Sequence, residues 1–133
     1  MNNNVVNWFD LPTKDFDRAV TFYSVILGTP IEVSDHMGKK LGFFPMPLDQ
    51  KGPGLPAQAG AGGDIVPPGA GHEPSADGVR IFLNCEGKLD AVLGRVEKAG
   101  GQIMAPKFSI GDPGFIAIIK DTEGNVIGLH SSE

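Results

Sequence analysis

The feature that most limits the fold is an internal repeat, in which the two halves of the chain match at an offset of about 72 residues. Identical residues coincide in the predicted helices, at the glycine that ends each helix and in the strands that follow. The identical pairs are Leu11/Leu83, Ala19/Ala91, Val20/Val92, Gly28/Gly100, Ile31/Ile103, Gly42/Gly114 and Phe43/Phe115. Agreement at equivalent structural positions favours a duplicated unit over chance. We therefore expect two modules with the same order of elements.

The first helix is predicted over about residues 15–27. Apolar residues recur along it at the spacing of a single helix face, and polar residues take the other face. The apolar face consists of Phe16, Ala19, Val20, Tyr23, Ile26 and Leu27. Thr13 or Asp15 is suited to cap the N-terminus, and Gly28 suits the left-handed position just past the C-terminus. The apolar face is expected to pack on a sheet.

Each half is predicted to follow the order strand, helix, strand, strand, strand. In the first half the predicted strands are 5–11, 29–33, 38–44 and 64–66, with a tight turn at 36–38. In the second half the predicted strands are 79–85, 102–105, 115–120 and 126–130. The second helix is marked by Leu89, Val92, Leu93 and Val96 and is ended by Gly100 and Gly101, and the sequence DTEGN (121–125) predicts a hairpin turn.

Proline and glycine mark the loops that divide the chain. Residues 45–62 are too rich in both to form a helix or a central strand. A loop of this length in a small domain is often functional, so we predict that residues 46–62 form a flap over a binding site. The modules are expected at about 4–67 and 79–131, joined by a linker at about 68–78.

Composition is typical of a single compact domain. The chain has 133 residues, of which 41% are hydrophobic and 20% charged. Its net charge of −5 and pI of about 5.1 argue against nucleic-acid binding, which needs clustered Lys and Arg. No apolar run is long enough to span a membrane and the first residues do not resemble a secretory signal, so we expect a cytoplasmic protein that does not bind membranes. The one cysteine, Cys85, excludes an internal disulfide and is expected to be a small strand residue.

Three segments carry a family resemblance. The sequences DFDRAVTFYSVILG, GKKLGFFPM and KDTEGNVIGLHS resemble the vicinal oxygen chelate superfamily, which includes glyoxalase I, bleomycin-resistance proteins and extradiol dioxygenases. The resemblance covers essentially the whole chain and is most specific in the first helix and the final hairpin. It implies an α+β fold in which two tandem βαβββ modules form a half-barrel around a cleft. It also implies a single domain over residues 1–133 and a homodimer.

The resemblance also identifies the positions at which metal-using members of the superfamily bind a divalent ion. Their ligands, usually His or Gln and Glu, come from the first and fourth strands of each module, and these positions correspond to Trp8, Asp64, Arg80 and Gly128. Indole and guanidinium groups are not metal ligands, and glycine has no side chain. We therefore expect no metal at the usual site and no other cofactor. An improvised site would use Asp64 and His130, with Asp10 or His72 as a further ligand.

If the superfamily's cleft is kept, strand alternation places several chemically useful side chains along it. These expected ligand-binding residues are Trp8, Asp10, Arg80, Phe82, Asn84 and His130. An aromatic ring, a guanidinium, a carboxylate, an amide and an imidazole suit a small, partly aromatic and anionic molecule.

Structural roles remain open for the same side chains. Trp8 is equally suited to the core, and Arg80 is equally suited to an ion pair with Asp10. His130 lies close to the C-terminus, where side chains are often exposed. Asp64 also fits an ordinary position at the edge of a strand.

Two classes of function agree with these residues. One is a metal-free protein that binds a small organic molecule, as bleomycin-resistance relatives do. The other is a lyase, isomerase or dioxygenase acting on a small metabolite, either without metal or with an atypical one. In the metal-free enzyme, His130 or Asp10 is the candidate general base and Arg80 would stabilise developing negative charge. The sequence leaves open whether the protein is an enzyme.

Overall fold

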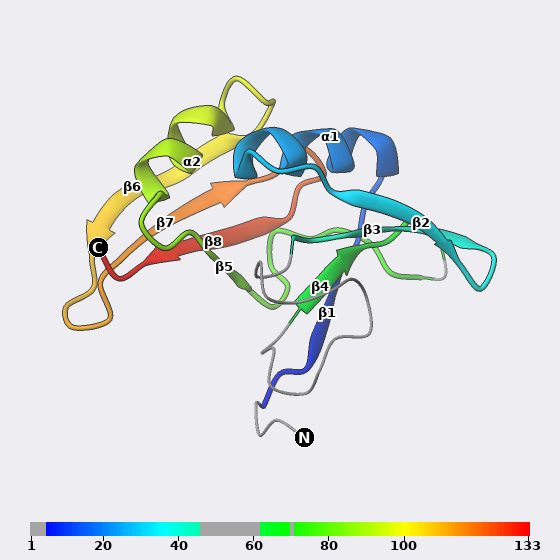
Figure 1. The fold of residues 1–133 in the computed structure, drawn as a ribbon, viewed down its shortest axis with the longest axis horizontal. Helices are drawn as coiled ribbons and strands as arrows, with labels where there is room; N and C mark the ends of the chain where they lie inside the picture. The colour runs from blue at the N-terminus through cyan, green and yellow to red at the C-terminus, as the bar shows by residue number, and fades with distance from the viewer. Residues whose placement is uncertain (1–4, 46–61, 70) are drawn as a thin grey trace.

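The computed structural model describes residues 5–45, 62–69 and 71–133, which form two four-stranded sheets and two helices (Figure 1). The first module consists of β1 (Trp8–Leu11), α1 (Phe16–Leu27), β2 (Glu32–His36), β3 (Lys39–Phe43) and β4 (Gly62–Ile65). The second consists of β5 (Phe82–Asn84), α2 (Leu89–Val96), β6 (Gln102–Ser109), β7 (Phe115–Lys120) and β8 (Val126–Ser131). The predicted flap lies outside the described residues except at Gly62.

The two sheets have the same topology, as the repeat predicts. Their strand orders are β1-β4-β3-β2 and β5-β8-β7-β6. In each sheet the first strand of the module runs parallel to the fourth, and the remaining neighbours are antiparallel. The α+β fold with two βαβββ modules is therefore confirmed.

Helix α1 begins and ends at the predicted capping residues. The Asp15 side chain accepts a hydrogen bond from the Arg18 backbone N–H at 3.0 Å, and Gly28 adopts the left-handed conformation with φ 68°. Phe22 is also buried, although it falls outside the predicted apolar face. Its ring packs against the second module, where a Cβ at Gly101 would lie 2.7 Å from it. Contact with the second module thus buries a wider face of α1 than packing on one sheet would.

Several strand ends differ from the sequence prediction. β2 spans 32–36 instead of 29–33, because Met37 and Gly38 form its turn to β3 with φ angles of 52° and 83° and extend the pairing to this point. β6 continues to Ser109 instead of ending at residue 105, and two shifts in register accompany its passage through Pro106.

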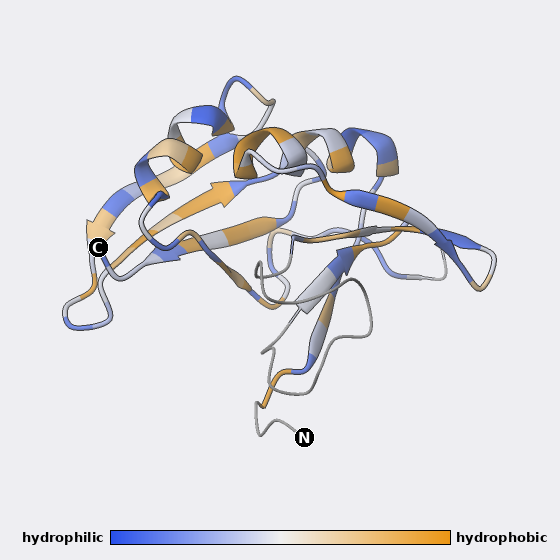
Figure 2. Ribbon diagram, in the orientation of Figure 1, coloured by the Kyte–Doolittle hydropathy of each residue, from blue (hydrophilic) through white to orange (hydrophobic). Residues whose placement is uncertain are grey.

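Other strands are shorter than predicted or displaced. β1 begins at Trp8, β5 spans only 82–84, and β4 spans 62–65 instead of 64–66. Helix α2 ends at Val96, four residues before the predicted glycine stop. β7 has the predicted bounds, and Figure 2 shows it as hydrophobic along most of its length.

The hydrophobic core lies between the helices and the sheets. Figure 1 shows α1 and α2 next to each other on the same side of the molecule, and the two helices contact each other. Helix α1 also contacts β4 of the first sheet, and α2 contacts β6, β7 and β8 of the second. Leu11 and Ile65 on the first sheet, and Leu83 and Leu129 on the second, point into this core. No helix in the described part of the chain is long and apolar enough to span a bilayer.

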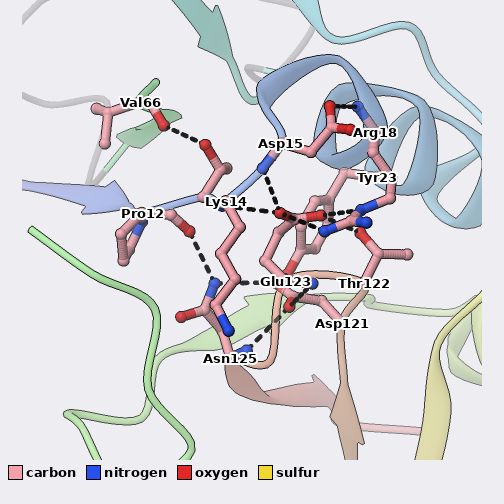
Figure 3. A network of polar contacts seen from close by, with 11 residues as sticks. Pro12, Lys14, Asp15, Arg18, Tyr23, Val66, Asp121, Thr122, Glu123 and Asn125 are labelled. Atoms are coloured by element: carbon pink, nitrogen blue, oxygen red, sulfur yellow. Dashed lines mark hydrogen bonds and ion pairs between the residues drawn. The ribbon is translucent and has the colours of Figure 1, made fainter. Parts of the chain in front are cut away.

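The DTEGN turn between β7 and β8 ties the second module to the start of α1 (Figure 3). The Glu123 carboxylate accepts hydrogen bonds from the backbone N–H groups of Lys14 and Asp15, each at 2.8 Å. It also accepts from Nε and Nη2 of Arg18, at 2.8 and 3.1 Å, and from the Thr122 hydroxyl, at 2.7 Å. Burial raises the pKa of Glu123, but these hydrogen bonds outweigh it and lower the pKa to about 2. The carboxylate therefore remains charged although its side chain is fully buried.

Asp121 organises the same turn from the inside. Its two oxygens accept from the Tyr23 hydroxyl at 2.6 Å, from the backbone N–H groups of Glu123 and Asn125, and from the Asn125 amide. The Asn125 amide also donates to the Pro12 carbonyl at 2.9 Å. The turn and its partners thus form a polar network in which each acidic group has several donors, and we call it the DTEGN network.

Candidate functional site

The side chains of β1 alternate between the core and the opposite face of the first sheet. Leu11 is buried in the core and Phe9 packs against Phe44, whereas Trp8 and Asp10 are exposed on the other face. Trp8 is 38% exposed, so it is not a core residue. Trp8 and Asp10 therefore share one face of the first sheet, as strand alternation predicts.

The parallel pairing of β1 with β4 brings a second carboxyl next to Asp10. Asp10 and Asp64 are Cα partners in this ladder, and Phe43 of β3 is the partner of Asp64 on its other side. Trp8 packs edge-on against Phe43, with ring centroids 6.2 Å apart and an interplanar angle of 63°. The result is an acidic pair beside two aromatic rings, which we call the Asp10–Asp64 pair.

Asp64 is unusual in its environment. It is only 4% exposed, and its Oδ1 atom has no hydrogen-bond partner among the described residues. Burial raises the pKa of Asp64 most and the adjacent Asp10 carboxyl raises it further, to about 7, although the Trp8 indole acts in the opposite direction. Because buried polar atoms are nearly always satisfied, this oxygen requires an explanation. Perturbed carboxyls of this kind are common at functional sites.

The sequence alone did not identify Asp64 as the centre of this site. Asp64 was expected as a metal ligand of an improvised set or as a residue at a strand edge. The available signal was the resemblance, which relates the first and fourth strands of each module to one site. Placing the fourth strand at 64–66 hid the register that aligns Asp64 with Asp10.

The equivalent position in the second module has no carboxyl. The repeat offset aligns Asp10 with Phe82, and Gly128 is the Cα partner of Phe82 as Asp64 is of Asp10. The Phe82 ring lies over Gly128, since a Cβ there would be 2.2 Å from its Cδ2 atom. The two modules therefore carry different chemistry at the same place in the fold.

Asn84 and His130 are Cα partners on the second sheet but are engaged with nearby backbone. The Asn84 side chain accepts from the Glu86 backbone N–H at 2.9 Å. His130 Nε2 lies 2.8 Å from the Pro113 carbonyl oxygen, which only accepts, so this nitrogen carries a proton and donates. Both contacts are structural in character.

Arg80 is exposed and precedes β5, outside the strand in which it was expected. Within residues 5–45, 62–69 and 71–133 the ion pairs are Arg18–Glu123 and Lys107–Asp90, so the pair between Arg80 and Asp10 that the sequence left open is not formed. The structure brings Trp8, Asp10 and Asp64 together, but Arg80 forms no ion pair with Asp10.

Cys85 directly follows β5 and is fully buried. Burial raises the pKa of its thiol, which disfavours the reactive thiolate. Its backbone N–H donates to the His130 carbonyl at 2.7 Å. This is the structural role expected from the sequence.

The donor set fits the superfamily's metal poorly. Of the four corresponding positions, only Asp64 supplies a metal-binding oxygen, since Trp8 and Arg80 are not ligands and Gly128 is covered by Phe82. In the part of the chain that the structure describes, no three His, Cys, Asp or Glu side chains come together. The improvised set of Asp64, His130 and Asp10 is thus not assembled within these residues.

Comparisons with known proteins agree with the fold and the repeat. Residues 5–129 match the family model described as Glyoxalase/Bleomycin resistance protein/Dioxygenase superfamily. The chain is 32% identical over 127 residues to a protein named "Putative glyoxylase CFP32" from Mycobacterium tuberculosis (strain CDC 1551 / Oshkosh), and equally to its namesake from Mycobacterium bovis. The match covers 92% of this chain but 44% of each relative, so the chain spans less than half the length of these curated relatives.

Solved structures show the same fold at low sequence identity. A glyoxalase/bleomycin resistance protein from Albidiferax ferrireducens T118 matches with a TM-score of 0.73 and 17% identity, over 98% of this chain and 100% of that chain. The fosfomycin resistance protein FosX from Listeria monocytogenes matches with a TM-score of 0.62 and 16% identity, over 100% and 96%. The family match over nearly the whole chain, together with the two βαβββ modules, shows that this chain belongs to the glyoxalase/bleomycin resistance protein/dioxygenase superfamily.

Proposed function

We propose that this chain binds a small, partly aromatic organic molecule at the Asp10–Asp64 pair, without the divalent metal used by metal-dependent members of the superfamily. The observation that carries the proposal is the buried Asp64 carboxyl with an unpartnered oxygen beside the Trp8 and Phe43 rings. Small-molecule sites typically combine aromatic walls with a few polar groups that fix orientation. The poor fit of the donor set to a metal supports a metal-free mode of binding.

Binding can be tested through Trp8, because it is the only tryptophan in the chain and gives a single indole N–H signal in NMR spectra. Glutathione adducts, catechols and glycopeptides are the first compounds to screen. A ligand should shift this signal, and Trp8→Ala should weaken the binding of that ligand, which calorimetry measures because the variant has no indole. Met37→Ala, in the exposed β2–β3 turn, is the matched control and should bind as the wild type does. A ligand that binds both variants equally would place the site elsewhere.

Metal independence is tested by elemental mass spectrometry of the purified protein and by thermal unfolding with zinc, nickel, manganese and iron. The proposal predicts a metal content well below one ion per chain and no stabilisation by any of the ions. About one tightly held ion per chain, with a rise of several degrees in Tm, would contradict it and make Asp64 and His130 the first residues to mutate.

The raised pKa of Asp64 favours a second candidate function, that of a metal-independent isomerase or lyase. A carboxyl that titrates near pH 7 can both accept and donate a proton at neutral pH, as a general acid–base catalyst must. In this function Asp64 is the general acid–base group, in place of His130 or Asp10, which the sequence suggested as the general base. If a substrate is turned over, Asp64→Asn should lower kcat by about 10²–10⁴-fold. Turnover that survives this substitution would leave binding as the function of the pair.

Two further expectations from the sequence remain part of the proposal. The resemblance implies a homodimer, and the composition favours a cytoplasmic location. Sedimentation equilibrium should give twice the monomer mass of 14.0 kDa, and a mass of one chain would remove the dimer from the proposal.

A further inference from the structure

The geometry points to a protonated amine as the ligand of the Asp10–Asp64 pair, with the Trp8 and Phe43 rings packing against the apolar part of the same molecule. This inference rests on the proposed function and specifies the class of ligand. It differs from the sequence expectation of an anionic ligand, which depended on Arg80.

The first argument comes from the strand pairing. Asp10 and Asp64 are neighbours across a parallel ladder, so their Cα atoms lie about 4.8 Å apart and their side chains leave the sheet on the same face. Two carboxyls at this separation can both contact one ammonium group. The ion pairs in the described residues involve other acids, so no cation of this part of the chain neutralises the two carboxyls.

The second argument comes from the unpartnered oxygen. Asp64 Oδ1 is buried and accepts no hydrogen bond from the described residues, and in its ionised form the carboxylate can only accept. The missing partner must therefore be a donor. An ammonium group supplies three donors and a positive charge, so it satisfies the orphaned oxygen and reaches Asp10 at the same time. An anionic group would instead meet two acidic side chains.

The third argument comes from the aromatic rings. Phe43 is the Cα partner of Asp64, and Trp8 packs edge-on against Phe43 at 6.2 Å. Aromatic faces attract cations, tryptophan most strongly. Trp8 is 38% exposed while Asp64 is 4% exposed, so the ring lies at the accessible margin of a buried acid. This order suits an arylalkyl amine whose charged end reaches inward and whose ring remains near Trp8.

The pair is also expected to exchange a proton for the amine. Burial and the adjacent Asp10 raise the pKa of Asp64 to about 7, so near neutral pH part of the protein carries a proton on this carboxyl, and binding of an ammonium group would displace it. The other titratable groups on this face, Glu32 and His36 of β2 and Lys39 of β3, are exposed. Amine binding should therefore strengthen as the pH rises from 6 to 8, with Asp64 as the main source of the released proton.

The test uses the full chain and three probes of similar shape in isothermal titration calorimetry at pH 7.5. These probes are 2-phenylethylammonium, the neutral 2-phenylethanol and the anionic 3-phenylpropionate. The inference predicts that the ammonium compound binds at least about tenfold more tightly than either of the others, because only it forms charge-assisted hydrogen bonds with the pair. At pH 6.5, titrations in two buffers of different ionisation enthalpy should reveal release of a proton.

Asp64→Asn is the decisive variant and Asp35→Asn is its control, since Asp35 is an exposed carboxyl on the opposite face of the same sheet. Asp64→Asn should weaken ammonium binding by about tenfold or more and abolish proton release. Asp35→Asn should change neither. Thermal unfolding of both variants verifies that they are folded.

Three results would overturn the inference. Equal affinity for the alcohol and the ammonium compound, or unchanged ammonium binding in Asp64→Asn, would show that the pair does not select a cation, while the proposed organic site would stand. If none of the three probes binds at millimolar concentration, arylalkyl amines are not the ligand class. The Trp8 indole screen described above then decides the proposed function independently.

Discussion

Two acidic clusters lie in this small fold, and they differ in almost every physical respect. In the DTEGN network, Glu123 accepts five hydrogen bonds and its pKa falls to about 2. In the Asp10–Asp64 pair, Asp64 is similarly buried, but it keeps an unpartnered oxygen and its pKa rises to about 7. Burial raises the pKa in both cases, and the number of donors decides the direction of the net shift.

The comparison separates an acid that stabilises the fold from one that is available for a ligand. A fully satisfied carboxylate has no capacity left for a partner, and its removal exposes buried donors. An unsatisfied carboxyl costs stability, and proteins commonly retain such costs at functional sites. Donor count is therefore a better guide to role than residue type or burial.

The largest expected effect is that of Glu123→Ala. This change leaves two backbone N–H groups and the Arg18 guanidinium without their acceptor, so we expect a loss of about 2–4 kcal/mol in the free energy of unfolding at pH 7. Because the pKa of Glu123 is depressed, the wild-type advantage should fade as the pH falls from about 4.5 toward 2. Urea unfolding at several pH values measures both. Glu97→Ala, at an exposed position, is the control. Equal losses of stability in the two variants would show that the hydrogen bonds of Glu123 to the start of α1 do not stabilise the fold.

Tyr23→Phe tests the inner part of the DTEGN network. The Tyr23 hydroxyl donates to Asp121 at 2.6 Å inside the core. Loss of a buried hydrogen bond to a charged group is expected to cost about 1.5–3 kcal/mol in the free energy of unfolding. The phenylalanine ring fills the same volume as the tyrosine ring, so this cost comes from the hydrogen bond and not from a cavity. Chemical denaturation with an unchanged m-value would isolate this contribution. A cost below about 0.5 kcal/mol would mean that solvent replaces the hydroxyl.

Asp64→Asn should have the opposite sign. The pKa of Asp64 is raised in the folded protein, so its contribution to stability is greatest at low pH and declines as the pH rises from about 4 to about 7. The asparagine variant does not titrate, and it should be more stable than the wild type by about 1–3 kcal/mol at pH 8 and no more stable near pH 4. Asp35→Asn should stay within about 0.5 kcal/mol at both pH values. If Asp64→Asn destabilised the protein at pH 8, the claim that the unsatisfied Asp64 costs stability would be wrong.

Thr122→Val should have the smallest effect. It removes one of the five donors to Glu123 and keeps the branched side chain. The remaining four donors should hold the carboxylate, so we expect a loss of only about 0.5–1 kcal/mol. Thermal unfolding alongside Glu123→Ala measures the ratio of the two effects. A loss as large as that of Glu123→Ala would show that the donors act as one indivisible unit.

Features that depend on nearby residues could be predicted from the sequence. Asp15 and Gly28 delimit α1 because capping involves contacts only a few residues apart. β7 has the predicted bounds because its apolar run is continuous. The βαβββ repeat was likewise readable from matched glycines and apolar positions.

Features that depend on distant residues could not be predicted. The end of β2 is fixed by its pairing with β3, and the buried state of Phe22 depends on Gly101 of the other module. Glu123 contacts the start of α1 across more than 100 residues of sequence. The role of Asp64 required the register of two strands more than 50 residues apart, which strand prediction with an error of two residues does not supply.

The most direct test of this account is an NMR titration of the side-chain carboxyl carbons of Asp64 and Glu123 in the same sample. The account predicts a midpoint near pH 7 for Asp64 and near pH 2 for Glu123. Asp10→Asn should then lower the midpoint of Asp64 and leave that of Glu123 unchanged. Midpoints near pH 4 for both carboxyls would contradict the distinction between a satisfied structural acid and an unsatisfied functional one.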